Sequence, residues 1–82
     1  MKNLLQYIIE NIVQNPKAVT IEEEKAPSGL VIFHLSVDPS DMGRIIGKEG
    51  KIIKAIRNVM KIRGLKENLR FSIDLKETSQ TD

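Results

Sequence analysis

The residues best suited to chemistry lie in the short loop "GKEG", in which Gly47 and Gly50 enclose Lys48 and Glu49. Glycines at both ends let the main chain turn tightly and let another molecule approach it closely. A helix beginning near Lys51 would present unpaired N–H groups and a partial positive charge, which attract phosphate oxygens. Lys48 and Lys51 would add full charges beside them. The loop therefore favours phosphate binding over the simpler alternative, a helix–helix turn that needs one glycine at most.

Nucleotide-binding motifs do not account for this loop. A P-loop has the pattern GxxxxGK[ST], whereas three residues separate Gly43 from Gly47, and Glu49 stands where a serine or threonine would bind magnesium. The dinucleotide fingerprint GxGxxG is also absent. The phosphate is therefore not expected to belong to a bound mononucleotide or dinucleotide.

The length and composition argue against an enzyme. A chain of 82 residues is enough for one domain, and such a domain buries only roughly 60–65% of its unfolded surface, which leaves little room for a catalytic centre. The sequence contains no carboxylate pair, Ser/His/Asp set or metal-ligand spacing, so no cofactor is implied. It contains no cysteine, which fits a reducing compartment. We expect a binding protein rather than a catalyst.

The basic residues are concentrated in one part of the chain, although the formal net charge is only +2 and the pI is near 9.0. Between residues 44 and 70 the acids are Glu49 and Glu67 alone, and most other acids lie at 22–24 or in the tail. Segregation of this kind suggests an anionic partner, but charge alone favours the alternative, a solvated helix face. The basic residues of this region are Arg44, Lys48, Lys51, Lys54, Arg57, Lys61, Arg63, Lys66 and Arg70.

Periodicity predicts a helix and two strands ahead of the loop. Apolar residues recur at helical spacing from Leu4 to Val13, and Asn15-Pro16 should end that helix. Residues 18–24 alternate as a short edge strand, and "APSG" (26–29) is a turn signal. Residues 30–37 predict a strand with Val31, Phe33, Leu35 and Val37 on one face and Ile32, His34 and Ser36 on the other.

Two helices and a last strand should position the loop. Ser40 can cap a short helix that runs from Met42 to Ile46, with Asp41 at its positive end. A second amphipathic helix follows the loop, and Gly64 is placed to end it as its C′ residue. Residues 69–75 alternate as a final strand. The expected order is α-β-β-α-α-β, one α+β domain over residues 1–76, followed by a polar, disordered tail over 77–82.

The segment "IIGKEGKIIKAIR" resembles the signature of the KH domain, in which Ile-Gly-x-x-Gly-x-x-Ile joins two helices. Ile46, Gly47, Gly50 and Ile53 occupy its four positions. The element order resembles the type II, bacterial arrangement with a three-stranded sheet packed on helices. The similarity is closest to the small bacterial KH-domain proteins of the KhpA (YlqC-type) family, and it covers Leu4 to Leu75.

This resemblance implies binding of single-stranded RNA, with the GxxG loop clamping the backbone of about four nucleotides and the bases lying in a groove between helices and a strand. Gly47, Lys48, Glu49 and Gly50 would form the clamp, although Glu49 is an anion inside a phosphate site. The isoleucines could form the groove floor or the core, and the cations could flank the backbone or be ordinary surface. The further candidate RNA-binding residues are Arg44, Ile45, Ile46, Lys51, Ile53, Lys54 and Arg57.

The aromatic residues agree with this interpretation. Phe33 and Phe71 lie on the apolar faces of their strands and are expected in the core rather than as stacking platforms for bases. His34 has no partner motif and is expected on the sheet surface.

The resemblance also implies a post-transcriptional regulator or RNA chaperone, and possible partners. These are a second copy, giving a homodimer, or a Jag-like (KhpB-type) RNA-binding protein, giving a heterodimer. The alternative function is a dimerisation module on a KH scaffold with incidental RNA binding. Its surface would be Ile32 on the sheet or the C-terminal half of the second helix. The longest apolar run, Leu30–Phe33, is too short to span a bilayer, and no signal-peptide core is present. A cytoplasmic protein without membrane partners is therefore expected.

Overall fold

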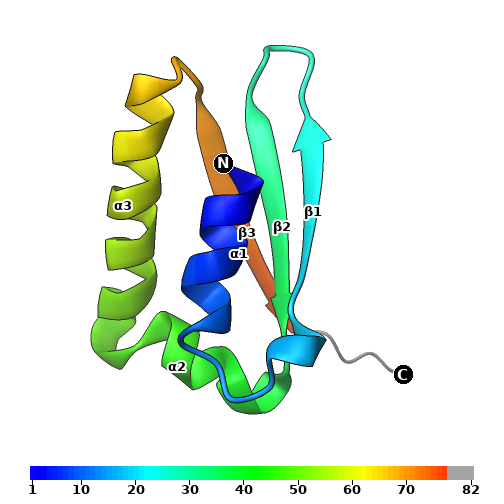
Figure 1. Ribbon diagram of the computed structural model, residues 1–82, viewed down its shortest axis with the longest axis vertical. Coiled ribbons are helices and arrows are strands. Elements are labelled where there is room, and N and C mark those ends of the chain that lie inside the picture. Colours follow the sequence, from blue (N-terminus) through cyan, green and yellow to red (C-terminus); the bar gives the residue numbers. More distant parts are fainter. Residues whose placement is uncertain (78–82) are drawn as a thin grey trace.

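The computed structural model describes residues 1–77, which form a three-stranded sheet with helices packed on one face (Figure 1). The order α-β-β-α-α-β and the single α+β domain are as predicted. The strands are β1 (Thr20–Lys25), β2 (Val31–Val37) and β3 (Phe71–Glu77). The α-helices are α1 (Lys2–Glu10), α2 (Met42–Ile46) and α3 (Lys51–Lys66), and short 3-10 turns are η1 (Pro16–Ala18), η2 (Pro39–Asp41) and η3 (Lys48–Gly50).

The central strand is β2, which pairs antiparallel with β1 and parallel with β3. Its predicted alternation is confirmed. The side chains of Val31, Phe33, Leu35 and Val37 are at most 2% exposed, whereas residues 32, 34 and 36 point to the opposite, partly open face. Since successive side chains of a strand alternate between faces, the buried residues of β2 mark the face of the sheet on which the helices pack, and Ile21 of β1 and Ile73 of β3 are buried with them.

The core lies between the sheet and the helices. Leu5 and Ile9 of α1 are fully buried against it, as is Met60 of α3. Phe33 is in the core, as predicted, and its ring centroid lies 6.3 Å from that of Phe71, which is only partly buried at the core's margin. The two rings join the central strand to β3.

The first helix is shorter than predicted. It ends at Glu10, whereas the sequence predicted an end just before Pro16. The Nδ2 of Asn11 donates a hydrogen bond to the carbonyl oxygen of Tyr7 at 2.7 Å. Asparagine side chains that bond nearby main-chain groups compete with helix continuation. Val13 is still buried, so the apolar stripe continues beyond the helix, and Pro16 begins η1.

The prediction that Gly64 ends the second helix is wrong. Gly64 lies inside α3, which continues to Lys66, and the left-handed residue that ends it is Asn68 (φ 57°). The N–H of Leu69 then donates to the Gly64 carbonyl at 2.8 Å, as in a Schellman motif. A Cβ on Gly64 would lie 2.9 Å from the Leu69 carbonyl oxygen and 3.3 Å from the Phe71 ring. Gly64 is therefore needed for close packing.

The prediction that Ser40 caps α2 is also wrong. Ser40 lies within η2, and the side chain of Asp38 accepts a hydrogen bond from the Ser40 N–H at 2.9 Å. Asp41 occupies the N-cap position of α2 but makes no capping bond there. An aspartate two residues before an N–H can bond it in an Asx turn, which displaces the serine from this role.

The last strand extends to Glu77, one residue into the predicted tail. The rest of that tail, residues 78–82, lies outside the described residues, so the expected disorder stays a prediction. Among residues 1–77, no helix combines the length and the apolar character that crossing a membrane requires.

Candidate nucleic-acid interface

The GKEG loop joins α2 to α3 through backbone conformations that favour glycine. Gly47 has φ 73° and ψ 176°, and Gly50 has φ 76° in the left-handed region. A Cβ on Gly47 would overlap the Ile52 side chain and lie 2.9 Å from the Ile52 main-chain nitrogen, whereas one on Gly50 would meet nothing within 4 Å. Glu49 itself has φ 59°. The two glycines therefore serve different purposes: Gly47 admits Ile52, and Gly50 permits the turn into α3.

The cations predicted around this loop are at the surface. Lys48, Lys51 and Lys54 are exposed and form no ion pair with any residue between 1 and 77. Arg44 is also exposed but contacts Asp41, with 3.4 Å between its Nε and the Asp41 Oδ1. Glu49 is exposed in the loop as well. Three lysine charges beside the start of a helix make this end of α3 favourable for an anion.

The three candidate isoleucines separate into two groups. Ile45 is 0% exposed and Ile53 is 8% exposed, so both belong to the core. Ile46 is 38% exposed beside the loop, and Ile52, which the sequence analysis did not single out, is exposed to the same extent. Of the proposed groove-floor residues, only Ile46 is therefore accessible to a ligand.

A groove of about 590 Å³ lies between α3 and β3. Its apolar part comes chiefly from the start of β3 and the residues just before it, and its rim carries arginine and lysine. Arg57 crosses from α3 to β3, where its Nη2 donates a hydrogen bond to the Ile73 carbonyl oxygen at 3.3 Å. The lining residues are Leu30, Arg57, Asn58, Lys61, Leu65, Leu69, Arg70, Phe71, Ser72 and Ile73.

Of these lining residues, only Arg57 was predicted as a site residue. Asn58, Lys61 and Leu65 follow Lys54 at spacings of three and four residues, so one face of α3 carries all four. That spacing could have revealed the helical wall. The other wall could not be found in this way, because it depends on β3 packing beside α3.

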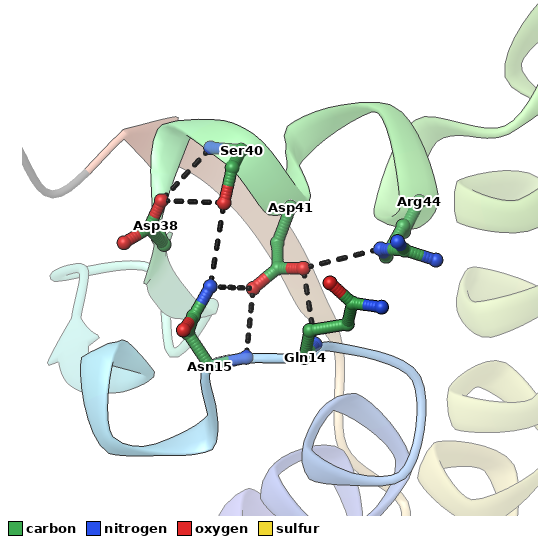
Figure 2. Close-up of polar contacts among 6 residues, drawn as sticks. All are labelled: Gln14, Asn15, Asp38, Ser40, Asp41 and Arg44. Carbon is green, nitrogen blue, oxygen red and sulfur yellow. Dashed lines mark hydrogen bonds and ion pairs between the residues drawn. The ribbon is translucent and has the colours of Figure 1, made fainter.

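Asp41 forms a buried polar junction at the start of α2 (Figure 2). Its carboxylate accepts hydrogen bonds from the main-chain N–H groups of Gln14 at 3.0 Å and Asn15 at 3.1 Å. The Nδ2 of Asn15 also lies 3.4 Å from Asp41 and 3.3 Å from the Ser40 Oγ. These bonds, the Gln14 N–H above all, lower the pKa of Asp41, with Arg44 adding to the effect against the opposing influence of burial. The sequence predicts Asp41 at the positive end of α2, but nothing in the local pattern indicates this role.

His34 lies on the open face of the sheet, as predicted. Its Nε2 is 2.7 Å from the Glu24 Oε1, and its Nδ1 is 3.4 Å from the Asp74 Oδ2. Among the described residues, no group of three or more His, Asp or Glu side chains is arranged to hold a metal ion.

A GxxG loop between two helices that pack on a three-stranded sheet is the arrangement of a KH domain. The KhpA/KhpB KH-domain model matches residues 2–75. RNA-binding protein KhpA of Chlamydia pneumoniae is 43% identical over 77 residues, which cover 94% of this chain and 97% of the relative. RNA-binding protein KhpA of Clostridium acetobutylicum is 41% identical over 75 residues, covering 92% and 99%. The chain belongs to the KhpA/KhpB KH-domain family.

Solved structures with a similar fold include Aquifex aeolicus Era bound to GDP and AlF4⁻, with a TM-score of 0.56 and 15% identity. This likeness covers 90% of the present chain and 28% of the Era chain. Era in complex with MgGDPNP and nucleotides 1506–1542 of 16S ribosomal RNA gives a TM-score of 0.54 at 14% identity, covering 92% and 30%. At such identities the likeness concerns the fold alone, and the chain spans less than a third of either Era chain.

Proposed function

We propose that this protein binds single-stranded RNA, with the GKEG loop on the RNA backbone and the bases in the groove between α3 and β3. The observation that carries the proposal is the position of Gly47–Gly50 at the start of the helix that also forms one wall of the groove. Relatives that match nearly the whole chain are named RNA-binding proteins. Their names support RNA as the ligand.

One face of α3 connects the loop to the groove. Lys54, Asn58 and Lys61 recur every three or four residues, so they follow each other along this face. The helix has 16 residues and is therefore about 24 Å long at 1.5 Å per residue. A strand held at Lys48–Lys51 could lie along this face and reach the groove, a length suited to the few nucleotides that a KH domain binds.

The charges favour weak and salt-dependent binding. Lys48, Lys51 and Lys54 are available for phosphates, while Arg44 is shared with Asp41 and Glu49 repels the backbone. Few phosphate contacts imply an affinity in the micromolar range or weaker, with each contact adding about −0.7 to the slope of log K against log salt. Weak, non-exclusive binding fits a post-transcriptional regulator or RNA chaperone better than a tight sequence-specific reader.

Crosslinking in cells followed by sequencing of the bound RNA tests the function directly. We expect enrichment of single-stranded RNA segments, and a Lys48→Asp variant expressed at the same level should lose most of it. Fluorescence anisotropy with a labelled single-stranded RNA, the same sequence as single-stranded DNA and an RNA hairpin would define the ligand in vitro. No enrichment over background, with anisotropy independent of salt, would contradict the proposal.

A second candidate function is pairing with another protein, and a specific surface favours it. Ile52, Val59 and Ile62 recur along α3 on a face distinct from the groove, and they are 38%, 48% and 65% exposed. We call these residues, with the exposed Ala55 among them, the α3 apolar row. Ile32 is less accessible, since it is only partly exposed. A helix that presents such a row can bury it against a matching helix.

We therefore propose a second copy of the chain, or a Jag-like RNA-binding protein, as the occupant of the α3 apolar row. Pairing would also raise the avidity of two weak RNA sites. Sedimentation at micromolar concentration, alone and with a Jag-like protein, is the test. If the chain sediments as a monomer both alone and with the Jag-like protein, this function is ruled out.

A further inference from the structure

The helix that leads into the GKEG loop is too short to hold its own position. α2 has five residues, and isolated helices of this length are not stable in water. Ile45 anchors its second half in the core. The N-terminus of α2 follows Asp41 directly, and the Asp41 side chain is buried, with 1% exposure.

Asp41 ties this end of α2 to a distant part of the chain. The residues that donate to its carboxylate, Gln14 and Asn15, lie in the connection between α1 and β1, 26 to 27 positions earlier. Figure 2 shows that connection passing beside the start of α2, with the carboxylate between them. Because the carboxylate makes no cap bond to α2 itself, its hydrogen bonds serve the tertiary link.

Asp41 also contacts a cation that lies close to the GKEG loop in the sequence. Arg44 lies one helical turn after it and three residues before Gly47, and its Nε faces the Asp41 Oδ1 at 3.4 Å. In Figure 2 one terminal nitrogen of the Arg44 guanidinium lies on the side away from Asp41. Within residues 1–77 the two terminal nitrogens of Arg44 have no hydrogen-bond partner, and the side chain is 47% exposed. An arginine held through Nε can still present its other N–H groups to a phosphate.

We propose that Asp41 is a positioning residue for RNA binding: it fixes α2 against the α1–β1 connection and aims the Arg44 guanidinium at the RNA backbone. The inference rests on the proposed function of the GKEG loop. It makes Arg44 a directed contact rather than one diffuse charge among several. A lysine at position 44 could not do both tasks. Arginine can contact Asp41 through Nε and offer the fork of its guanidinium to a phosphate, whereas lysine has a single ammonium group.

The first test is Arg44→Lys, which keeps the charge at an exposed position. We expect binding of a fluorescein-labelled RNA oligonucleotide of randomised sequence, measured by anisotropy, to weaken roughly fivefold. Arg63→Lys is the matched control, since Arg63 also contacts a carboxylate through Nε, that of Glu67 at 2.6 Å, but lies outside the proposed site. It should bind as the parent does. Parental affinity in Arg44→Lys would overturn the inference.

The second test is Asp41→Asn, with Asp38→Asn as its control because, within residues 1–77, the side chain of Asp38 bonds only Ser40. In a folded Asp41→Asn protein we expect a loss of affinity at least as large as that of Arg44→Lys. Adding Arg44→Lys should then cost less than about twofold more, because the orientation is already lost. Two results would overturn the inference: losses of affinity from Asp41→Asn and Arg44→Lys that multiply in the double variant, or unchanged affinity in folded Asp41→Asn. If Asp41→Asn does not fold, Arg44→Lys decides alone.

Lys48→Asp in the same assay separates the two proposals. Weakened binding in Lys48→Asp, with parental binding in Arg44→Lys, would leave the RNA-binding function standing and remove the role of Asp41. Parental binding in Lys48→Asp would instead reject the loop as the RNA site, and the inference with it.

Discussion

The side chain of Ile52 lies so close to Gly47 that a Cβ on Gly47 would come within 2.8 Å of the Ile52 Cβ. Gly47 also has φ 73° with an extended ψ, a combination nearly confined to glycine. Gly47→Ala should therefore destabilise the fold by more than about 2 kcal/mol. Gly50→Ala, which keeps a left-handed φ but meets no atom, should cost only about 1 kcal/mol, or 4–8 °C in Tm. Thermal melts of the two variants compare these effects. Equal losses of stability would contradict the close contact between Gly47 and Ile52.

The charges of the loop should act on RNA binding in opposite directions. Lys48→Asp should weaken binding roughly tenfold and flatten the salt slope, whereas Glu49→Lys should strengthen it and steepen the slope by about 0.7 if one further phosphate contact forms. Both residues are exposed, so stability should change by only about ±0.5 kcal/mol. Anisotropy titrations over a range of salt concentrations measure the slopes.

Matched controls for these variants are Lys25→Asp and Glu23→Lys, which make the same charge changes on β1, away from the loop. If the controls alter binding as much as the loop variants do, net charge rather than the loop position explains the effect.

Two glycines in helices should respond to alanine in opposite ways. A Cβ on Gly43 of α2 would meet nothing within 4 Å, so Gly43→Ala should stabilise the protein by about 0.5–1 kcal/mol through helix propensity alone. Gly64→Ala should instead destabilise it by about 1–3 kcal/mol, because the new methyl would push against the Leu69 carbonyl and the Phe71 ring. Denaturant unfolding gives both values. A gain in stability for Gly64→Ala would show that β3 can shift away from α3.

The lowered pKa of Asp41 predicts acid sensitivity. A carboxyl whose pKa falls below its usual value near 3.8 on folding stabilises the fold fully above that pH, and its contribution is lost as the pH drops further. The Tm of the parent should therefore exceed that of Asp41→Asn by a constant margin from pH 7 to about pH 4.5, and the margin should shrink below about pH 4. Asp38→Asn is the control. A margin that stays constant into stronger acid would contradict an ionised, hydrogen-bonded Asp41.

The α3 apolar row can be tested by one charged substitution. Ile62→Glu should reduce any self-association or pairing with a Jag-like protein at least tenfold, since a charge would be buried in the contact. Tyr7→Glu is the control, because Tyr7 on α1 is exposed to a similar extent (68% against 65%) but lies on another helix. Sedimentation measures both. If Ile62→Glu pairs as the parent does, the partner binds elsewhere.

The sequence predicted those parts of the fold that depend on local pattern. The alternation of β2 and the glycines around Lys48 and Glu49 can be read from period and residue type. Two helix ends were predicted wrongly because an asparagine acts where proline or glycine was expected. Asn11 ends α1 before Pro16 is reached, and Asn68 takes the left-handed position expected of Gly64.

The candidate site could be predicted only in part, because some of its features depend on contacts between distant segments. The buried bonds of Asp41 join residues far apart in the chain, and the groove needs β3 beside α3. Ile45 and Ile46 are neighbours of the same type, and only the packing of α2 makes one core and the other surface.

The edge position of β1 has a consequence for how copies of the protein meet. A strand at the edge of a sheet offers unpaired main-chain groups to any other strand, and this is a route to aggregation. Glu22, Glu23 and Glu24 are consecutive and exposed on β1. A second copy approaching edge to edge would bring two such triplets together, and their repulsion opposes a continuous intermolecular sheet. Charge thus protects the β1 edge of the sheet, and we expect any association between copies to avoid this edge.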